Sequence, residues 1–515
     1  MTADAFPAAQ AHDRSAVHQD RSFFGHPRGL GLLFVVEMWE RFSYYGMRAL
    51  LVLYLVNGLR WDKAEAARLY GSYTSLVYLT PLVGGYLADR LIGTRRSMIL
   101  GGVVIALGHF ALALPGLPWF YAGLGLIIVG TGFFKPNVST QVGQMYPPGD
   151  ARRDAGFTIF YMGVNAGAAI GPLVCGSLAQ SERFGWHWGF AAAGVGMVIG
   201  LLVYLWGRER YLPGIGLRQV HAVRAGETGP GAGRALYLEA SGGALAGAVL
   251  GGLASNWGLQ QVVMGAVIGA ALAVTVLGTH GEERRRVLAI FLAAFFVVFF
   301  WAAYEQAGSS MNLFADKFTD LGVGGFQIPS TWFQSVNPVI ILAFGPLFAM
   351  LWGALARRGK EPSTALKMVT GLALLGVGFL FMVAGGARAD GGAKVSPVWL
   401  LLAYSFHTFG ELCLSPVGLS YVTKIAPVRF AALLMGVWYL ANAAANKLAG
   451  ALAAYTPVPG QAPPAVESGL GGFVQRVSAS NAGFFSIFVV MSLAAAAAMF
   501  LFVPLLKRLT AGVKA

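Results

Sequence analysis

Long apolar segments alternate with short polar stretches along most of the chain. Many of these segments reach the roughly 20 residues that a helix needs to cross a bilayer. The pattern predicts about fourteen such helices, over residues 29–57, 66–88, 96–114, 118–145, 154–180, 186–206, 235–254, 258–278, 287–315, 329–355, 364–386, 396–424, 430–454 and 479–506. The chain is therefore expected to be an all-α, polytopic membrane protein.

The pattern of the first half recurs in the second half at equal spacings. Val35, Val36, Trp39 and Gly46 match Val297, Val298, Trp301 and Gly308, and Gly130, Pro136 and Pro147 match Gly410, Pro416 and Pro427. Internal repeats with a binding site at their interface are typical of transporters. We therefore predict two six-helix bundles, 29–206 and 282–508, with a linker over 207–234, an inserted two-helix hairpin over 235–281, and tails over 1–28 and 509–515.

Composition and charge agree with a membrane protein. Of the 515 residues 56% are hydrophobic and 12% are charged, with a net charge of +14. The basic residues concentrate in the segments predicted to face the cytoplasm, which explains the positive charge without a nucleic-acid partner. We expect no signal peptide, and both termini in the cytoplasm. Cys175 and Cys413 lie in different apolar segments, as buried hydrophobes do, so we expect neither a metal nor a redox cofactor.

Charged residues within the apolar segments are the candidate functional residues, because charge is costly in lipid. In the first segment Glu37, Arg41, Tyr44, Tyr45 and Arg48 recur every three or four positions, so in a helix they lie on or near one face and can pair instead of meeting lipid. Glu40 is a second acid in the same segment. At about 1.5 Å rise per residue, Glu37 to Arg41 fall in a central layer with Lys135, Asn165 and Glu411. Arg48 and Glu305 fall nearer the outer side and can pair, as can Lys135 and Glu411. Lys447 has no obvious partner in this scheme.

Two groups of motifs carry a resemblance to known families. The run from Gly85 through Asp89 to Arg95-Arg96 resembles the loop motif of the major facilitator superfamily. The segments Glu37-Met38-Trp39-Glu40-Arg41-Phe42 and Phe160-Tyr161-Met162-Gly163-Val164-Asn165, together with Glu411, closely resemble the proton-dependent oligopeptide transporter family of that superfamily. The inserted hairpin is similar to that of bacterial members.

This resemblance implies the major facilitator fold and proton-coupled import of di- and tripeptides by alternating access. By motif it assigns proton coupling to Glu37, Glu40, Arg41, Lys135 and Glu305, and the outer gate to Arg48 and Glu305. Substrate contacts fall to Arg41, Tyr44, Tyr45, Arg48, Tyr78, Lys135, Asn165, Trp301, Asn337, Glu411 and Trp438. It also implies a monomer in the bacterial inner membrane, in contact with lipid, with no cofactor besides the coupling proton.

Two other functions fit the sequence less well. A relative of this fold could carry another small solute, such as nitrate or an amino-acid derivative, but Glu411 suits an ammonium group and not an anion. An intramembrane enzyme would need a catalytic pair at one depth, and none is recognisable in the sequence. Some animal members carry a histidine in the second helix where this chain has Gly71. Proton coupling is therefore expected to rest on the glutamates.

Overall fold

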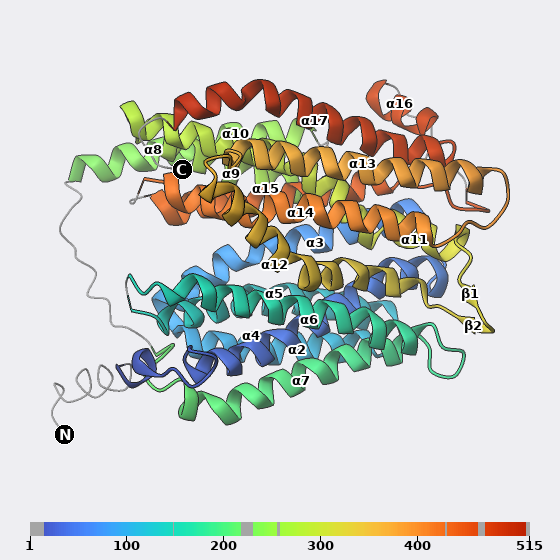
Figure 1. Ribbon diagram of the computed structural model, residues 1–515, viewed down its shortest axis with the longest axis horizontal. Coiled ribbons are helices and arrows are strands. Elements are labelled where there is room, and N and C mark those ends of the chain that lie inside the picture. The colour runs from blue at the N-terminus through green and yellow to red at the C-terminus, as the bar shows by residue number, and fades with distance from the viewer. Residues whose placement is uncertain are drawn as a thin grey trace. The chain divides into compact units, whose positions relative to one another are not determined.

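The computed structural model describes residues 15–147, 149–217, 230–254, 258–427, 430–461 and 469–510. The described chain is largely helical (Figure 1), which confirms the all-α prediction. Nine of the described helices are long and apolar enough to cross a membrane, so the predicted number of about fourteen is not confirmed. Residues 1–14, 218–229 and 511–515 of the predicted tails and linker lie outside the described residues, as do the side chains of Asp89 and Arg90 in the loop motif.

The chain divides into two compact units. Unit 1 comprises Met1–Ala66, Leu79–Val220 and Ala307–Gly345, and unit 2 comprises Ala67–Tyr78, His221–Gln306 and Pro346–Ala515. One helix, α3 (Lys63–Leu87), is shared, because its middle belongs to unit 2 and its two ends belong to unit 1. The boundaries of the two six-helix bundles stay a prediction.

Unit 1 is built around α2, which packs against α6 and α7, while α4 packs against α5 and α7. Its helices are α2 (Arg28–Leu53), the ends of α3, α4 (Thr94–Leu112), α5 (Leu117–Gln144), α6 (Arg152–Ala179), α7 (Trp186–Tyr211), α11 (Ser310–Phe318) and the first part of α12 (Val336–Arg357). Strands β1 (Gly322–Val323) and β2 (Phe326–Gln327) form a short antiparallel pair in which Gly322 lies opposite Gln327.

Unit 2 is built from two groups of packed helices and the inserted hairpin. α13 packs against α14 and α17, α10 packs against α15, and α8 packs against α9. The helices are α8 (Pro230–Ala254), α9 (Leu259–Leu277), α10 (Gly281–Tyr304), α13 (Thr364–Asp390), α14 (Val398–Ile425), α15 (Ala431–Ala453), α16 (Gly469–Val477) and α17 (Asn481–Leu509), with the rest of α12 and the middle of α3.

Local sequence signals set several helix ends. The Asp62 carboxylate caps α3 by accepting hydrogen bonds from the backbone N–H groups of Ala64 and Glu65. Asp390, at the end of α13, accepts hydrogen bonds from the backbone of Asn481 and Ala482 at the start of α17. These carboxylates satisfy amides that the first helical turn leaves without a partner.

The structure differs from the predicted helices at several places. The single helix predicted over 287–315 is wrong, because a 3₁₀ turn over Glu305–Gly308 separates α10 from α11 and Ser309 adopts φ −124° and ψ −92°. The sequence there, Gly308-Ser309-Ser310, consists of weak helix formers. α7 continues to Tyr211, beyond its predicted end at residue 206. α16 was not predicted.

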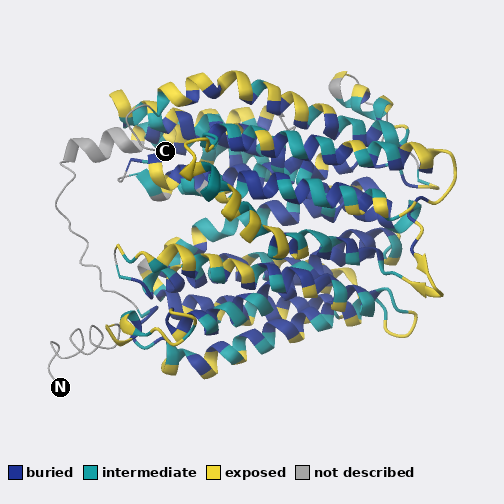
Figure 2. Cartoon of the chain, viewed as in Figure 1, coloured by how far each residue is buried: buried dark blue, intermediate teal, exposed yellow. Residues whose placement is uncertain are grey.

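Exposed side chains on the membrane-length helices are strongly apolar. Figure 2 shows exposed positions along α7 and α17. The exposed large apolar residues of these two helices include Leu202, Trp206, Val490 and Leu501. Large apolar side chains at such positions are expected to face lipid, since lipid carries no penalty for them.

Candidate functional site

The charged residues of α2 form a buried cluster in unit 1. Arg41 lies between two carboxylates: its Nε is 3.1 Å from Glu37 Oε1, and it donates a short hydrogen bond to Glu40. All three side chains are at most 5% exposed. The spacing of Glu37 and Arg41 by four residues places them on neighbouring turns of one helix face. The prediction that Glu37 and Arg41 pair on one helix face is confirmed.

Two atoms of this cluster keep capacity for further bonds. Glu37 Oε2 and Arg41 Nη2 are buried, and neither has a hydrogen-bond partner among the described residues. A buried polar atom without a partner costs about 1–3 kcal/mol, so it persists where function uses it. The half-buried Lys135 ammonium, on α5, interacts electrostatically with Glu37. The cluster therefore contains two potential anions and two cations.

Aromatic residues continue the same face of α2. The Arg41 guanidinium lies 5.2 Å from the centre of the Tyr44 ring, and the Arg48 guanidinium lies 5.5 Å from the Tyr45 ring. The two tyrosine rings meet edge to face at 5.2 Å. Cation–π contacts of this kind hold a guanidinium in place without neutralising its charge. The face thus links the acidic cluster to Arg48 through packed tyrosines.

Close contact between α2 and α6 positions this cluster. A Cβ built on Gly167 would overlap the Met38 carbonyl oxygen and lie 2.9 Å from Phe42 N. The glycine therefore allows the two backbones to approach each other. Asn165, two residues away on α6, is buried and donates to the Tyr161 carbonyl oxygen at 2.9 Å. The described hydrogen bond of its amide is thus within its own helix. Asn337, on α12, is half-buried in the same unit.

In unit 2 one predicted residue, Trp301 of α10, reaches the predicted Glu411 of α14 through Tyr304. Tyr304 donates a 2.5 Å hydrogen bond to Glu411 Oε2. The Tyr304 ring also meets the rings of Trp301 and Phe300, at 5.1 and 5.7 Å between centres. Sequence reasoning did not select Tyr304. Its position one helical turn after Trp301 was the available signal, because residues three apart share a helix face.

The remaining candidates of unit 2 lie on other helices. Glu305 is buried at the break after α10, and its neighbour Gln306 donates to the Ala449 carbonyl oxygen of α15. Trp438 is buried on α15, and Tyr78 is half-buried on α3. The predicted pairs Arg48–Glu305 and Lys135–Glu411 each join a residue of unit 1 to a residue of unit 2, and they stay predictions.

A second polar network lies at the end of unit 1 that holds the loop motif. The buried Arg95 donates to both Glu209 oxygens at 3.0 Å and to the carbonyl oxygens of Leu212 and Ile215 at 2.7 and 3.0 Å. One guanidinium thereby fixes the start of α4 to the segment that follows α7. Arg95 belongs to the basic pair of the loop motif, and its charged hydrogen bonds hold these two segments together.

Residues 15–27 pack against the same end of unit 1, where they contact Arg152 and Tyr146. Arg152 donates to the carbonyl oxygens of His18 and Gly25 and forms a bidentate pair with Asp150. His26 Nδ1 lies 2.9 Å from the Tyr146 hydroxyl. Burial and the nearby Arg152 lower the pKa of His26, and burial raises the pKa of Tyr146 to about 12. Both groups are therefore held neutral in this contact.

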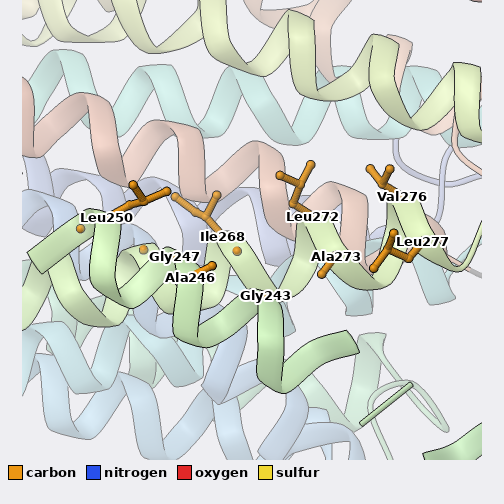
Figure 3. A pocket seen from close by; sticks show the side chains of 12 residues that line it. Gly243, Ala246, Gly247, Leu250, Ile268, Leu272, Ala273, Val276 and Leu277 are labelled. Atoms are coloured by element: carbon orange, nitrogen blue, oxygen red, sulfur yellow. The ribbon is translucent and has the colours of Figure 1, made fainter. Parts of the chain in front are cut away.

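A groove between α8 and α9 is apolar, in contrast to the charged cluster of α2. It has a volume of about 470 Å³, and its twelve lining residues are all glycine or apolar, among them Gly247, Leu250, Ile268 and Leu272 (Figure 3). Binding sites for charged ligands need a few placed polar groups, which this lining does not supply. Among the described residues no cluster of three or more His, Cys, Asp or Glu side chains could hold a metal ion.

Comparison with known proteins decides the family. The model of the POT family matches residues 95–214 and 259–467. The chain belongs to the POT family. Similar relatives include the peptide transporter YePEPT of Yersinia enterocolitica, 38% identical over 84% of this chain and 88% of the relative. The di-/tripeptide transporter of Lactococcus lactis subsp. cremoris is 37% identical over 83% and 89%.

A solved structure supports the same assignment. A variant of a peptide transporter POT in complex with alafosfalin is 36% identical, with a TM-score of 0.78 over 98% of this chain and 99% of that chain. The family resemblance inferred from Glu37, Arg41, Asn165 and Glu411 is confirmed, and so is the expectation of a transporter instead of an enzyme. This POT-family chain is an integral membrane transporter.

Proposed function

We propose that this POT-family protein is a proton-coupled symporter that imports di- and tripeptides. The observation that carries the proposal is the buried cluster of α2, in which two glutamates flank Arg41 while one carboxylate oxygen and one guanidinium nitrogen stay without a hydrogen-bond partner. Such a cluster can exchange a proton and accept a carboxylate at the same place. The names of the Yersinia and Lactococcus relatives support a peptide substrate.

Charge balance gives the coupling. With Glu37 and Glu40 ionised and Arg41 and Lys135 protonated, the formal charges of the cluster sum to zero. A substrate carboxylate would bring one uncompensated negative charge into a buried site, which is costly. Protonation of one glutamate restores neutrality and frees a cation for the incoming carboxylate. Arginine stays protonated in proteins, so the glutamates are the groups that exchange the proton.

The two ends of a peptide call for opposite charges. In this proposal Arg41, Lys135 and Tyr45 hold the carboxylate, while Glu411, Asn165 and Asn337 hold the amino end and the amide. The aromatic rings of Trp301 and Tyr304 beside Glu411 favour an ammonium group, since cations bind aromatic faces. Tyr44, Tyr78 and Trp438 supply adaptable walls for variable side chains.

Transport would proceed by alternating access of the two predicted six-helix bundles, with Arg48 and Glu305 as the outer gate. Buried opposite charges can stabilise one state and separate in the other. We further propose that the protein works as a monomer in the bacterial inner membrane, with both termini in the cytoplasm. The concentration of basic residues in the predicted cytoplasmic segments supports this orientation.

The test is uptake of labelled dialanine into proteoliposomes with and without an inward proton gradient. Wild type should accumulate dialanine only with the gradient. The double variant Glu37→Gln, Glu40→Gln should lose this accumulation and keep exchange of labelled for unlabelled dialanine, because binding survives while proton release does not. Glu182→Gln is the matched control, since Glu182 is exposed.

Three results would contradict the proposal. Gradient-driven accumulation by the double Gln variant would remove the coupling role of the glutamates. Equal accumulation by wild type with and without the gradient would remove symport. Competition by acetylated dialanine as strong as that by dialanine would contradict recognition of the amino end by Glu411, and competition by nitrate would favour an anion transporter.

A further inference from the structure

The middle of α3 packs against α15 of unit 2 at a pair of glycines. A Cβ built on Gly71 would lie 2.7 Å from Gly450 Cα and 2.9 Å from the Asn446 carbonyl oxygen. A Cβ on Gly450 would lie 2.6 Å from the Ala67 carbonyl oxygen. The backbones of α3 and α15 therefore touch over one helical turn. Such contacts between small residues depend on dispersion attraction, which is lost when the two helices move apart by a small distance.

A polar bond crosses this contact. Lys447 Nζ donates a 2.6 Å hydrogen bond to Ser72 Oγ, and the same hydroxyl donates to the Arg68 carbonyl oxygen at 2.7 Å. Ser72 thus uses both its donor and one acceptor site. A lysine in an apolar helix needs an acceptor, because its ammonium is costly to bury. The contact with α3 supplies that acceptor to Lys447.

The inserted hairpin contacts the same part of α3. Gln260 Nε2 lies 3.5 Å from the Ser72 carbonyl oxygen, and Ser75 Oγ lies 3.7 Å from Met264 Sδ. The two contacts are three residues apart on α3 and four apart on α9, close to one turn on each helix. α9 therefore follows α3 in a consistent register and does not merely touch it at one point.

The C-terminal end of α9 is held by α10. Arg284, in the first turn of α10, donates to the carbonyl oxygens of Val276 and Thr279 at 3.0 and 2.9 Å. A guanidinium at a helix C-terminus both satisfies carbonyls and interacts favourably with the helix dipole. α9 also packs against α10 and α15. α9 is thus anchored at its C-terminal end and presents its N-terminal turns to α3.

We propose that Lys447 and α9 of the inserted hairpin form a latch for α3. The latch, defined by Lys447, Ser72, Gln260, Met264 and Ser75, holds residues 67–78 against α15 in one conformational state and opens in every transport cycle. This inference rests on the proposed alternating access, in which bundle 29–206 carries α3 and bundle 282–508 carries α15. It gives the hairpin a conformational role and makes Lys447 a positioning residue.

The strength of the latch suits a reversible contact. It consists of the charged hydrogen bond from Lys447 to Ser72, the long contact of the Gln260 amide and the contact between the Ser75 hydroxyl and the Met264 sulfur. The close packing of Gly71 against Gly450 adds to these. Loss of a hydrogen bond to a charged group is expected to change the ratio of two states by roughly tenfold or more. The latch is therefore strong enough to bias a state and weak enough to open.

The first test measures the state directly, without substrate. Spin labels are placed on the exposed positions 65 of α3 and 451 of α15 by Glu65→Cys and Ala451→Cys, with Cys175→Ala and Cys413→Ala as background. Double electron–electron resonance gives the populations of short and long distances. Lys447→Met and Ser72→Ala should each raise the long-to-short ratio roughly tenfold, and the double variant should do no more than either single variant. Lys507→Met, at an exposed lysine, should leave the ratio unchanged.

The second test cross-links α9 of the hairpin to α3. Ser75→Cys and Met264→Cys in the same background are joined by a short bifunctional thiol reagent that a reductant cleaves. Uptake of dialanine should stop on joining and return on reduction, while each single cysteine variant treated alike keeps its uptake. Unchanged uptake by the joined protein would overturn the role of the hairpin.

The two tests separate the latch from the proposed function. An unchanged distance ratio in Lys447→Met and in Ser72→Ala, or additive shifts in the double variant, would overturn the latch even if peptide uptake is normal. Absence of dialanine uptake by wild type would refute the proposed function. The distance ratio would still decide whether the latch exists.

Discussion

The approach of α2 and α6 at Gly167 gives the sharpest test of the site geometry. In Gly167→Ala the new methyl group would overlap the Met38 carbonyl oxygen and lie 2.9 Å from Phe42 N, and both atoms belong to the backbone. Neither can rotate away. The helices must separate by more than about 0.6 Å to bring the second contact to the optimum near 3.5 Å. Overpacking of this kind costs about 1–3 kcal/mol.

The predicted result has two parts. The melting temperature of the detergent-solubilised protein should fall by roughly 1–3 °C. Met38 and Phe42 flank the cluster residue Arg41, so its displacement relative to Asn165 should lower dialanine uptake at least about tenfold, as misplacement of reacting groups does. Thermal unfolding followed by tryptophan fluorescence measures the first part, and initial uptake rates measure the second.

The matched control is Gly125→Ala on α5. A Cβ at Gly125 would meet no heavy atom within 4 Å, and alanine is a better helix former than glycine by about 1 kcal/mol. Gly125→Ala should therefore melt at or above the wild-type temperature. The reasoning would be refuted if Gly167→Ala were as stable as wild type, or if both variants lost the same stability.

Two further predictions concern the polar networks at the end of unit 1. Arg95→Met should lower the free energy of unfolding by about 2–4 kcal/mol, because it removes charged hydrogen bonds to Glu209 and two carbonyl groups; Arg96→Met, at an exposed neighbour, should have little effect in the same chemical denaturation experiment. The fold lowers the pKa of His26 below its ordinary value of 6.5, so its contribution to stability is present above pH 6.5 and is lost as the pH falls through the lowered pKa. Proteolysis within residues 15–27 should accordingly increase from about pH 7.5 to about pH 5 in wild type and less so in His26→Gln, with His280→Gln as the exposed control. A pH response in His26→Gln equal to that of wild type would contradict this assignment.

Helical class and the composition of the α2 cluster followed from the sequence because both are local properties. Runs of apolar residues define a helix in lipid whatever it packs against. The pairing of Arg41 with Glu37 needs only a four-residue spacing and low exposure. The break after Tyr304 was missed, since the apolar run alone cannot show that Ser309 leaves the helical conformation.

Contacts between distant segments were decided by the tertiary structure. Tyr304 and Glu411 are far apart in the chain, and no spacing rule predicts their hydrogen bond. Lys447 had no obvious partner in the sequence, and packing of α3 against α15 through glycines brings Ser72 to it. Sequence by itself therefore determined which charges must be buried, because lipid penalises exposed charge on any helix. Only the tertiary structure decided which groups neutralise or bind them, because this depends on how closely particular backbones approach.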